Sequence, residues 1–401
     1  MSHKESIPAG VTLLAGAYTL DPAPWPPFDA SVLGFLNALS ENIRALPRGN
    51  VSEEMRSLGF WLRRAHLLGL REAYGRADAL GLGISFHIAP ANVPLLFAWS
   101  CAIGLLAGNA CRVRVSGRRT GDAEQLCALI RELLADGAYA PLVKRISVLA
   151  YDRSLTDLTQ RFSSECSARV VWGGDRTVEE IRRIPIRPRA VELSFPDRAS
   201  LCVLGADAVL ALPHEALCDL AARFYNDTYA MDQNACSCPK LVCWEESDAK
   251  TGARAASRFW NAAAKAARRY RLSEIKVTRK YGALWEYAGQ NGRVCRIRRW
   301  DNLLYVLELS ALSRDFPDIP MQFGSFLEYH MQEKGEWADA VSEKTQTVTF
   351  FGVSGEALME TALRGRLRGV SRIAPVGQAL FMDLTWDGKN LIDSLSRRIS
   401  R

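Results

Sequence analysis

From residue 84 onward the chain alternates between short apolar segments and helical patterns, and this alternation constrains the fold more than any other feature. Apolar strands are predicted at residues 84–89, 110–115, 145–150, 168–172 and 190–195. Helices are predicted between them at residues 95–106, 122–134 and 177–184. Strands that are apolar along their whole length and are joined by helices form a parallel sheet covered on both faces. The predicted fold class is therefore α/β. Ligands bind at the carboxyl ends of such strands, so this part is a candidate nucleotide-binding domain.

The rest of the chain repeats this theme less regularly. Further strands are predicted at residues 200–204, 240–244, 303–309 and 347–351, and further helices at residues 214–225 and 248–270. Apolar spacings of three and four predict amphipathic helices at residues 31–47 and 53–74, whereas the Pro-rich residues 1–30 are expected to run over the surface. Residues 386–390 predict a turn, followed by a short helix that ends at Arg397-Arg398. A length of 401 residues suits two domains.

Composition narrows the function only a little. The net charge of +7 suits anionic small ligands such as nucleotides or coenzyme A, although a solvated surface is the simpler explanation of any single arginine cluster. No aromatic residues are interleaved with the basic runs at 182–189 and 296–299, so nucleic-acid binding is not expected. Residues 84–111 carry no formal charge, but Pro90 and Pro94 interrupt them. A buried strand and helix are therefore favoured over a membrane span.

The cysteine pattern indicates free thiols. The ten cysteines show no paired framework and no zinc-ligand spacing with histidine, so no metal site is predicted. Those that lie in apolar runs are predicted to be buried: Cys101, Cys127, Cys202, Cys218 and Cys243. Because no secretory signal is recognisable at the N-terminus, a reducing cytoplasm is the expected compartment.

One pair of cysteines lies in a different setting. The segment Asp232-Gln-Asn-Ala-Cys236-Ser-Cys238-Pro239 is small and polar and ends in proline, which is typical of a thiol presented at a turn. A thiol placed that way can attack a carbonyl carbon and hold the acyl group as a thioester. The residues alone also allow a structural role or a redox pair for Cys236 and Cys238.

Two other segments contain groups that such chemistry needs. Asn92 follows the strand 84–89 and precedes Pro94, which suits the first turn of the next helix. Its amide and the helix N-terminus could stabilise an oxyanion, and a simple helix cap is the alternative. Gly173-Gly174 lies between a strand and a helix and would let a pyrophosphate approach the backbone. A tight turn is the alternative, because no Gly-x-Gly-x-x-Gly occurs.

Three further titratable residues allow less specific interpretations. Glu192 lies in the otherwise apolar strand 190–195, where it could serve as a general base or could face solvent at the sheet edge. His87 stands between Phe86 and Ile88, and a hydrogen-bonded core histidine is the favoured interpretation. His214 is expected near the start of a helix.

Taken together, these segments resemble the aldehyde dehydrogenase superfamily, and within it the acyl-CoA reductase family that includes the fatty acid reductase of bacterial luminescence. The resemblance covers residues 80–400 in order. The matching segments are Pro90-Ala-Asn92-Val-Pro94, Val113-Arg114-Val115-Ser116, Val171-Trp-Gly173-Gly174-Asp175, Asp232 to Pro239, Gln346-Thr347, and Trp386-Asp-Gly388 with Arg397 or Arg398. The chain departs from the superfamily at Arg114, where a lysine is usual, and at Met321-Gln322-Phe323-Gly324, where no glutamate stands.

The resemblance implies roles for individual residues. Cys236 would be the nucleophile, Asn92 would hold the oxyanion, and Glu192 would assist proton transfer. Arg114, Ser116, Gly173 and Gly174 would bind NADPH or NADH. The implied reaction is reduction of an acyl thioester, from coenzyme A or an acyl-carrier protein, to an aldehyde.

The resemblance also implies a domain plan and partners. An N-terminal helical region (1–79) and a C-terminal tail (371–401) would complete a Rossmann-type NAD(P)-binding domain (80–199), which precedes an α/β catalytic domain (200–370). An acyl-activating synthetase and a homo-oligomer are compatible partners. The alternatives are an acyltransferase that uses the same cysteine, and a non-catalytic subunit on the same fold.

Overall fold

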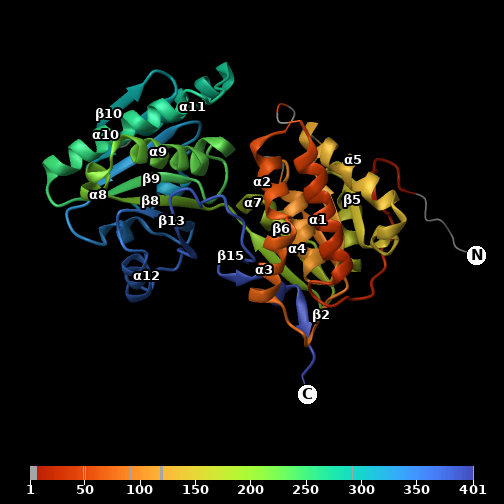
Figure 1. Cartoon of the computed structure of the whole chain (residues 1–401). Coiled ribbons are helices and arrows are strands. Elements are labelled where there is room, and N and C mark those ends of the chain that lie inside the picture. Colours follow the sequence, from red (N-terminus) through yellow and green to blue (C-terminus); the bar gives the residue numbers. More distant parts are fainter. Residues whose placement is uncertain are drawn as a thin grey trace, which may run out of the picture. The chain divides into compact units, whose positions relative to one another are not determined.

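The computed structural model describes residues 7–47, 49, 51–90, 93–117, 121–290 and 292–400. The chain forms two compact units (Figure 1). The first unit contains the residues up to Pro196 together with the tail from Asp383, and the second unit contains Asp197–Met382.

The sheet of the first unit has the strand order β1-β5-β4-β3-β6-β7. Its strands are β1 (Thr12–Gly16), β3 (Ile84–Ile88), β4 (Ala110–Val115), β5 (Ile146–Ala150), β6 (Ala168–Trp172) and β7 (Val191–Phe195). All neighbouring strands are parallel except β1, which runs antiparallel to β5. The predicted parallel sheet is therefore confirmed. The expectation that residues 1–30 run over the surface is wrong for β1, because Leu14 and Ala15 are buried against the sheet.

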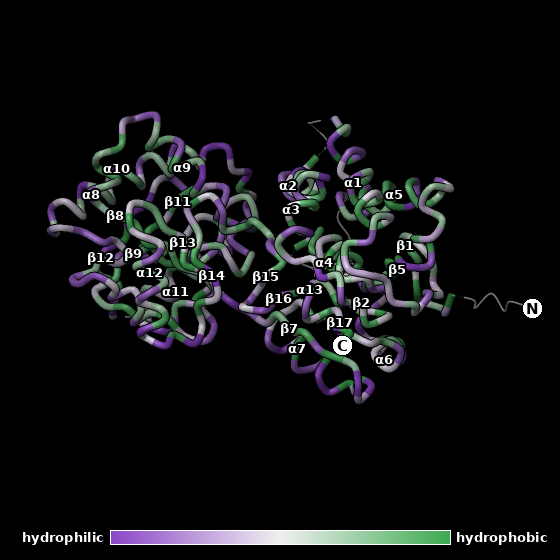
Figure 2. The backbone as a smooth tube through the Cα atoms, turned by 60° about the horizontal axis from the view of Figure 1, so that its bottom comes forward, coloured by the Kyte–Doolittle hydropathy of each residue, from purple (hydrophilic) through white to green (hydrophobic). Residues whose placement is uncertain are grey.

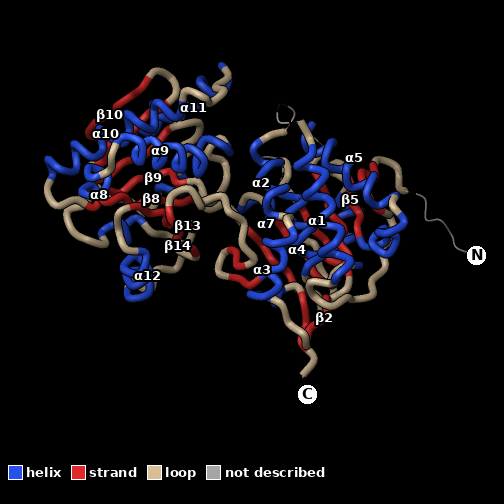
Figure 3. The backbone as a smooth tube through the Cα atoms, in the orientation of Figure 1, coloured by secondary structure: helices blue, strands red, loops and turns tan. Residues whose placement is uncertain are grey.

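Helices cover both faces of this sheet (Figure 3). They are α1 (Ala30–Ala45), α2 (Glu53–Trp61), α3 (Arg64–Tyr74), α4 (Leu96–Leu106), α5 (Gly121–Ala135), α6 (Thr156–Glu165) and α7 (Asp175–Arg182), with a 3-10 helix η2 (Gly137–Arg145). Phe162 of α6 and Val178 of α7 pack on Phe86 and Ile88 on one face. On the other face, α4 contacts His87 through Ser100, and α1 packs on α4 and α5.

The predicted helix 53–74 is two helices, because the chain is extended at Arg63 (φ −62°, ψ 142°). No proline or glycine marks this break. Asn37 of α1 accepts a hydrogen bond from the Arg64 amide at 2.9 Å and so satisfies the first turn of α3. The apolar periodicity of residues 53–74 is continuous, and the contact with α1 divides this segment into two helices.

The second unit has a larger sheet in the order β10-β11-β12-β9-β8-β13-β14, parallel except for the edge strand β10. Its strands are β8 (Ala199–Gly205), β9 (Pro239–Glu245), β10 (Val294–Trp300), β11 (Leu304–Leu309), β12 (Ser325–His330), β13 (Thr345–Phe351) and β14 (Arg372–Pro375). Its helices are α8 (Ala206–Ala211), α9 (His214–Thr228), α10 (Ala249–Ala267), α11 (Glu274–Gln290) and α12 (Gly355–Arg364), with 3-10 turns η3 (Tyr229–Met231), η4 (Phe316–Asp318) and η5 (Glu336–Ala340).

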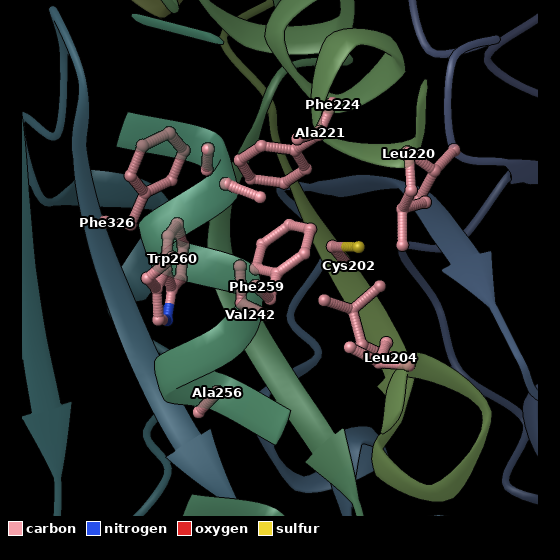
Figure 4. Packing of buried hydrophobic residues seen from close by; sticks show 14 of the residues in the cluster. Cys202, Leu204, Leu220, Ala221, Phe224, Val242, Ala256, Phe259, Trp260 and Phe326 are labelled. Carbon is pink, nitrogen blue, oxygen red and sulfur yellow. The ribbon is translucent and has the colours of Figure 1, made fainter. Parts of the chain in front are cut away.

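An apolar cluster lies on each face of this second sheet. On one face, aromatic residues of α9 and α10 pack on the strands, with Phe224, Phe259 and Trp260 in mutual ring contact (Figure 4). On the other face, Leu284 of α11 and Leu358 of α12 join a second buried cluster. The hydropathy of the backbone follows this layering, with apolar strands inside and polar loops outside (Figure 2). The helix predicted at residues 248–270 is confirmed as α10.

The C-terminal tail differs from its predicted course. The turn at residues 386–390 is present as a hairpin of β15 (Thr385–Trp386) and β16 (Lys389–Asn390), with Asp387 and Gly388 at φ of 48° and 71°. The helix α13 (Leu391–Ser394) then ends before the arginines. Arg397 and Arg398 lie in β17 (Ser396–Arg398), which pairs with β2 (Ala79–Gly81).

Four of the five cysteines predicted to be buried are buried, and Cys218 is the exception. Leu217, Leu220 and Ala221 turn the apolar stripe of α9 toward the core, so Cys218 falls on the exposed side of the helix. No helix in the described residues is long and apolar enough to span a membrane. The cytoplasmic location stays a prediction.

Candidate functional site

The first unit offers a ligand-binding edge at the carboxyl ends of its parallel strands. In chain order, β4 and β5 follow β3 on one side of it in the sheet, and β6 then pairs with the other side of β3. The order reverses between β3 and β6, and such a switch point is where α/β sheets bind ligands. Of the residues predicted to bind a cofactor, Arg114 and Ser116 lie at the end of β4, and Gly173 and Gly174 follow β6.

Gly173 and Gly174 directly follow β6 and precede α7. Gly174 has φ −64° and ψ 161°, and no side chain caps the first turn of the helix. A Cβ on Gly173 would lie 3.1 Å from the Cβ of Thr177, so a larger residue here would require the Thr177 side chain to move slightly. The helix amides at this edge suit an anion, although Asp175 in the first turn opposes one.

Arg114 and Ser116 reach the same edge from β4. The guanidinium of Arg114 lies over the ring of Tyr151, with 5.0 Å between Cζ and the ring centroid. Its Nε is buried and has no hydrogen-bond partner within the described ranges. A buried donor without an acceptor costs free energy, and a polar ligand would satisfy it. The structure thus brings Arg114, Ser116, Gly173 and Gly174 to one edge of one sheet.

Asn92 lies outside the described residues, so its predicted oxyanion role stays a prediction. The helix that follows it, α4, begins at Leu96. Its first turn is capped from another element, because the Glu54 carboxylate of α2 accepts a hydrogen bond from the Leu95 amide at 2.8 Å. Burial raises the pKa of Glu54 from 4.5 to about 7, with the nearby Asp122 acting in the same direction and the Leu95 amide opposing it. Sequence reasoning missed this contact.

We expect Glu54→Gln to stabilise the protein at pH 8 by about 2 kcal/mol and to leave it nearly unchanged at pH 5. The folded protein keeps the Glu54 proton up to about pH 7, whereas the unfolded chain loses it near 4.5. The free energy of unfolding of the wild type therefore falls as pH rises between these values. The Glu54→Gln substitution removes this pH dependence because its side chain does not titrate. Urea unfolding at pH 5, 6, 7 and 8 measures it. Glu53→Gln, at an exposed position of the same helix, is the control and should follow the wild-type curve. An unchanged pH dependence for Glu54→Gln would contradict the assignment.

Glu192 does not join the carboxyl edge. It lies opposite Arg169, near the amino ends of β7 and β6. Its carboxylate accepts a hydrogen bond from Arg169 Nε at 2.7 Å and also from Arg182 Nε and Ser194 Oγ, both at 3.2 Å. This is the setting of a structural ion pair. His87 is also structural, because Ser100 Oγ and Ser85 Oγ lie 2.6 and 2.8 Å from its ring nitrogens.

In the second unit, the cysteine motif forms the loop between η3 and β9. The backbone enters it through two consecutive left-handed residues, Asp232 (φ 54°) and Gln233 (φ 56°). The Gln233 amide donates to the Thr228 carbonyl, the Asn234 amide to Met231 and the Cys238 amide to Ala235, at 2.9, 2.8 and 3.0 Å. The predicted turn is therefore present, and its fixed geometry presents Cys236.

The buried side chain of Gln233 clasps this loop to the segment before β12. It is 1% exposed. Its Nε2 donates to the carbonyls of Pro239 and Ser325 at 3.3 and 3.1 Å. Its Oε1 accepts from the amides of Gly324 and Ser325 at 2.7 and 3.2 Å. All four hydrogen-bonding positions of the amide are used, so the loop conformation is strongly specified.

The two cysteines of the motif differ in accessibility. Cys238 is buried, and burial raises the pKa of its thiol well above the ordinary range. Cys236 is partly exposed. Its carbonyl accepts a hydrogen bond from Ser200 Oγ at 2.8 Å, and Ser200 Oγ in turn accepts one from the Thr347 amide at 3.0 Å. The Gln346-Thr347 segment is thereby linked to the cysteine loop. Only Cys236 of this pair can be reached by a substrate.

Helix α11, which sequence reasoning did not find, supports the loop from outside. Lys276 Nζ lies 2.8 Å from the carboxylate of Asp232. One turn further, Lys280 Nζ donates to the carbonyls of Asn302 and Phe323 at 2.5 and 2.7 Å. Burial lowers the pKa of Lys280 to about 7. The Phe323 turn is also tied directly to the loop, because Gln322 Nε2 donates to Asn234 Oδ1 at 2.7 Å. The sequence feature that could have pointed to this contact is the segment Met321-Gln322-Phe323-Gly324, which stands out because it lacks the usual glutamate.

Across the part of the chain that the structure describes, no cluster of three or more His, Cys, Asp or Glu side chains is arranged to hold a metal ion. The candidate site therefore consists of two parts: the carboxyl edge of the first sheet, and the rigid cysteine loop of the second unit.

Comparison with solved structures identifies the fold. The chain is similar to lactaldehyde dehydrogenase from Escherichia coli, with a TM-score of 0.62 and 12% identity over 91% of this chain and 85% of that one. It is also similar to an NAD-dependent aldehyde dehydrogenase from Sinorhizobium meliloti, with a TM-score of 0.64 and 13% identity over 92% and 83%. The architecture is that of the aldehyde dehydrogenases.

Sequence comparison is more specific. The long-chain acyl-protein thioester reductase of Aliivibrio fischeri is 28% identical over 127 residues. This alignment covers 31% of the chain and about a quarter (25%) of that relative's length. A model of the family described as acyl-CoA reductase (LuxC) matches residues 49–280, more than half of the chain. That range includes the carboxyl edge of the first sheet and the cysteine loop, and the chain therefore belongs to the acyl-CoA reductase (LuxC) family.

Proposed function

We propose that this protein reduces an acyl thioester to an aldehyde through an acyl group held on Cys236, with NADPH or NADH as the reductant. The observation that carries the proposal is the contrast between the two thiols of one rigid loop. Cys236 is accessible, whereas Cys238 is buried and its raised pKa disfavours a thiolate. Membership of the acyl-CoA reductase (LuxC) family supports the same reaction.

The proposed reaction begins on the sulfur of Cys236. Its thiolate attacks the carbonyl carbon of the substrate, and the carbon–sulfur bond to coenzyme A or to the carrier breaks, so that the leaving thiolate takes up a proton. The Cys236 amide, together with Asn92, would donate hydrogen bonds to the oxyanion. When bound, the reduced nicotinamide supplies a hydride. The resulting hemithioacetal on Cys236 collapses to release the aldehyde and restore the thiolate.

The residues at the carboxyl edge of the first sheet fit a dinucleotide. The glycine pair allows a pyrophosphate to approach the uncapped start of α7. Among the described residues the buried Nε of Arg114 has no acceptor, and a ribose or phosphate oxygen would provide one. Ser116 adds a hydroxyl at the end of the same strand. We assign Arg114, Ser116, Gly173 and Gly174 to cofactor binding on this basis.

In this proposal Glu192 takes no part in proton transfer, because Arg169 and Arg182 hold its carboxylate away from the carboxyl edge of the first sheet. Acyl-CoA and acyl-carrier protein are both candidate donors, and an acyl-activating synthetase would supply the second kind. Self-association stays a prediction from the resemblance.

Trapping the acyl-enzyme tests the proposal. The full chain is incubated with tetradecanoyl-CoA in the absence of nicotinamide, and intact mass is followed by peptide mapping. We expect one acyl group, on Cys236. Cys218 and Cys295 are also exposed, so they are internal controls for unselective acylation. NADPH or NADH should then remove the adduct and release an equal amount of aldehyde. Acylation without nucleotide oxidation, followed by transfer to an added amine, would instead show the acyltransferase.

A further inference from the structure

A lysine stands at the point where the cysteine loop enters β9. We propose that the ammonium group of Lys240 holds the thiol of Cys236 in its thiolate form. The inference rests on the proposed function, because it concerns the nucleophile of that reaction. An ordinary cysteine, with a pKa of about 8.5, is only a few per cent ionised at pH 7, and the thiolate is the form that attacks a carbonyl carbon.

A β-bulge places Lys240 outside the regular pairing of its strand. The register between the parallel strands β8 and β9 shifts by one residue after the pair formed by Ser200 and Pro239, and Lys240 is the extra residue on β9. Bulges are rare between parallel strands and redirect a side chain. This one lies where the cysteine loop is attached to the sheet, because Ser200 Oγ donates to the Cys236 carbonyl at 2.8 Å.

The redirected ammonium group of Lys240 is fixed by the turn η4. Its Nζ donates to the carbonyls of Pro317 and Ile319, both at 3.1 Å. An ammonium group has three N–H donors, so one remains for another acceptor. Among the described residues Lys240 forms no ion pair with a carboxylate. A partly buried cation that is held by neutral carbonyls keeps its charge available to a neighbouring anion.

The electrostatic surroundings of Lys240 single out Cys236 as that neighbour. Burial lowers the pKa of Lys240, whereas the nearby Cys236 raises it. The carboxylates of Asp197 and Asp318 also raise this pKa, but less than Cys236 does. Both carboxylates are exposed to solvent, and Lys344 Nζ lies 2.7 Å from that of Asp318. Because the attraction between two charges is mutual, the ammonium stabilises a Cys236 thiolate as much as the thiolate stabilises the ammonium.

The other titratable groups of the loop do not take the place of Lys240. Cys238 is buried, and its raised pKa keeps its thiol protonated. Asp232 lies 2.8 Å from Lys276 Nζ, so this pair contributes little net charge. The charge of Lys240 also suits the last step of the proposed reaction, because collapse of the hemithioacetal expels the same thiolate. Lys240 thus acts through Cys236 and not on the substrate.

Alkylation of the thiol tests the inference without an acyl donor. The full chain, as wild type, Lys240→Met and Lys240→Arg, is treated with the neutral reagent iodoacetamide between pH 5 and pH 10. Peptide mapping gives the rate at Cys236. We expect the midpoint of its pH profile to lie at least about one pH unit higher in Lys240→Met than in wild type. Lys240→Arg keeps the positive charge, so its midpoint should stay within about half a pH unit of wild type.

The rates supply a second signature, which a merely loosened loop would not produce. Well below both midpoints, Lys240→Met should react about threefold more slowly than wild type, because fewer of its Cys236 thiols are ionised. Well above both midpoints it should react about threefold faster, because a more basic thiolate is the better nucleophile. The two curves are therefore expected to cross.

The matched control is Lys334→Met, which removes an exposed lysine that pairs with Glu245 at the other end of β9. Its Cys236 profile should follow wild type, and the exposed thiols of Cys218 and Cys295 should be alkylated alike in every variant. An equal midpoint in wild type and Lys240→Met would overturn the inference. So would a Lys240→Arg profile that matches Lys240→Met, or a wild-type midpoint at or above the ordinary value of about 8.5.

Intact mass after incubation with tetradecanoyl-CoA separates this inference from the proposed reaction. A wild-type chain whose Cys236 has the lowered midpoint but takes up no acyl group would refute the acyl-enzyme and leave the pairing with Lys240 standing. An acyl group on Cys236, together with equal midpoints in wild type and Lys240→Met, would leave the reaction standing and refute the role of Lys240.

Discussion

Replacing Cys236 with alanine is expected to lower aldehyde formation by at least about a thousandfold, because the substituted chain has no sulfur on which to hold the acyl group. Cys238→Ala should retain the acyl adduct and keep the rate within about threefold of wild type, because its thiol is buried and its raised pKa keeps it protonated. NAD(P)H oxidation with an acyl thioester, together with adduct mass in the absence of nucleotide, measures both effects.

Two further substitutions make this comparison specific. Cys218→Ala and Cys295→Ala remove the other exposed thiols of the described chain and should change neither the rate nor the adduct. If Cys238→Ala were the inactive variant, the nucleophile would be reassigned and the register of the motif would be wrong. If both single variants stayed active, an acyl-enzyme on this loop would be excluded.

Replacing Gln233 with alanine is expected to destabilise the second unit by about 3 to 5 kcal/mol. The substitution removes four hydrogen bonds and leaves the Gly324 amide buried without its acceptor, whereas the Ser325 amide keeps the Gln322 carbonyl at 3.2 Å. Hydrogen exchange of peptides covering residues 228–245 and 320–330, with urea unfolding of the full chain, measures the loss. Acylation of Cys236 should slow as the loop is released.

The matched control for Gln233 is its neighbour in the same network. Gln322 is only partly buried and makes one side-chain bond, to Asn234 Oδ1. Gln322→Ala should therefore cost about 1 kcal/mol. If the two variants lost similar amounts of unfolding free energy, the hydrogen bonds of Gln233 would not be what fixes the loop conformation.

The parallel sheets could be predicted because apolar strands and helices alternate clearly between residues 84 and 245. Strand β12 was missed because Glu328 interrupts its apolar pattern. That carboxylate is fully buried and accepts hydrogen bonds from the indoles of Trp244 and Trp260, partners that lie far away in the sequence. Helix α11 was missed because it exposes aromatic residues and glycines, so its apolar stripe is indistinct. A pattern that records only hydrophobicity cannot show either feature.

For the candidate site, the sequence indicated where the thiol lies but not what holds it. The polar turn around Cys236 was predicted from its composition, and the structure contains it. The hydrogen bonds from Ser325 to Gln233, from Lys276 to Asp232 and from Lys280 to Phe323 join residues that are 92, 44 and 43 positions apart. Glu192 attracted attention as a carboxylate in an apolar strand, and only the register with Arg169 shows why it is there.

The distance in sequence between Gln233 and the amides that donate hydrogen bonds to it has a consequence for biosynthesis. The amides that fix the loop belong to Gly324 and Ser325. A growing chain that ends before them contains the thiol but not the geometry that presents it. The ribosome must therefore synthesise Gly324 and Ser325 before the loop around Cys236 can take up its final conformation, so the thiol is made well before its setting is complete.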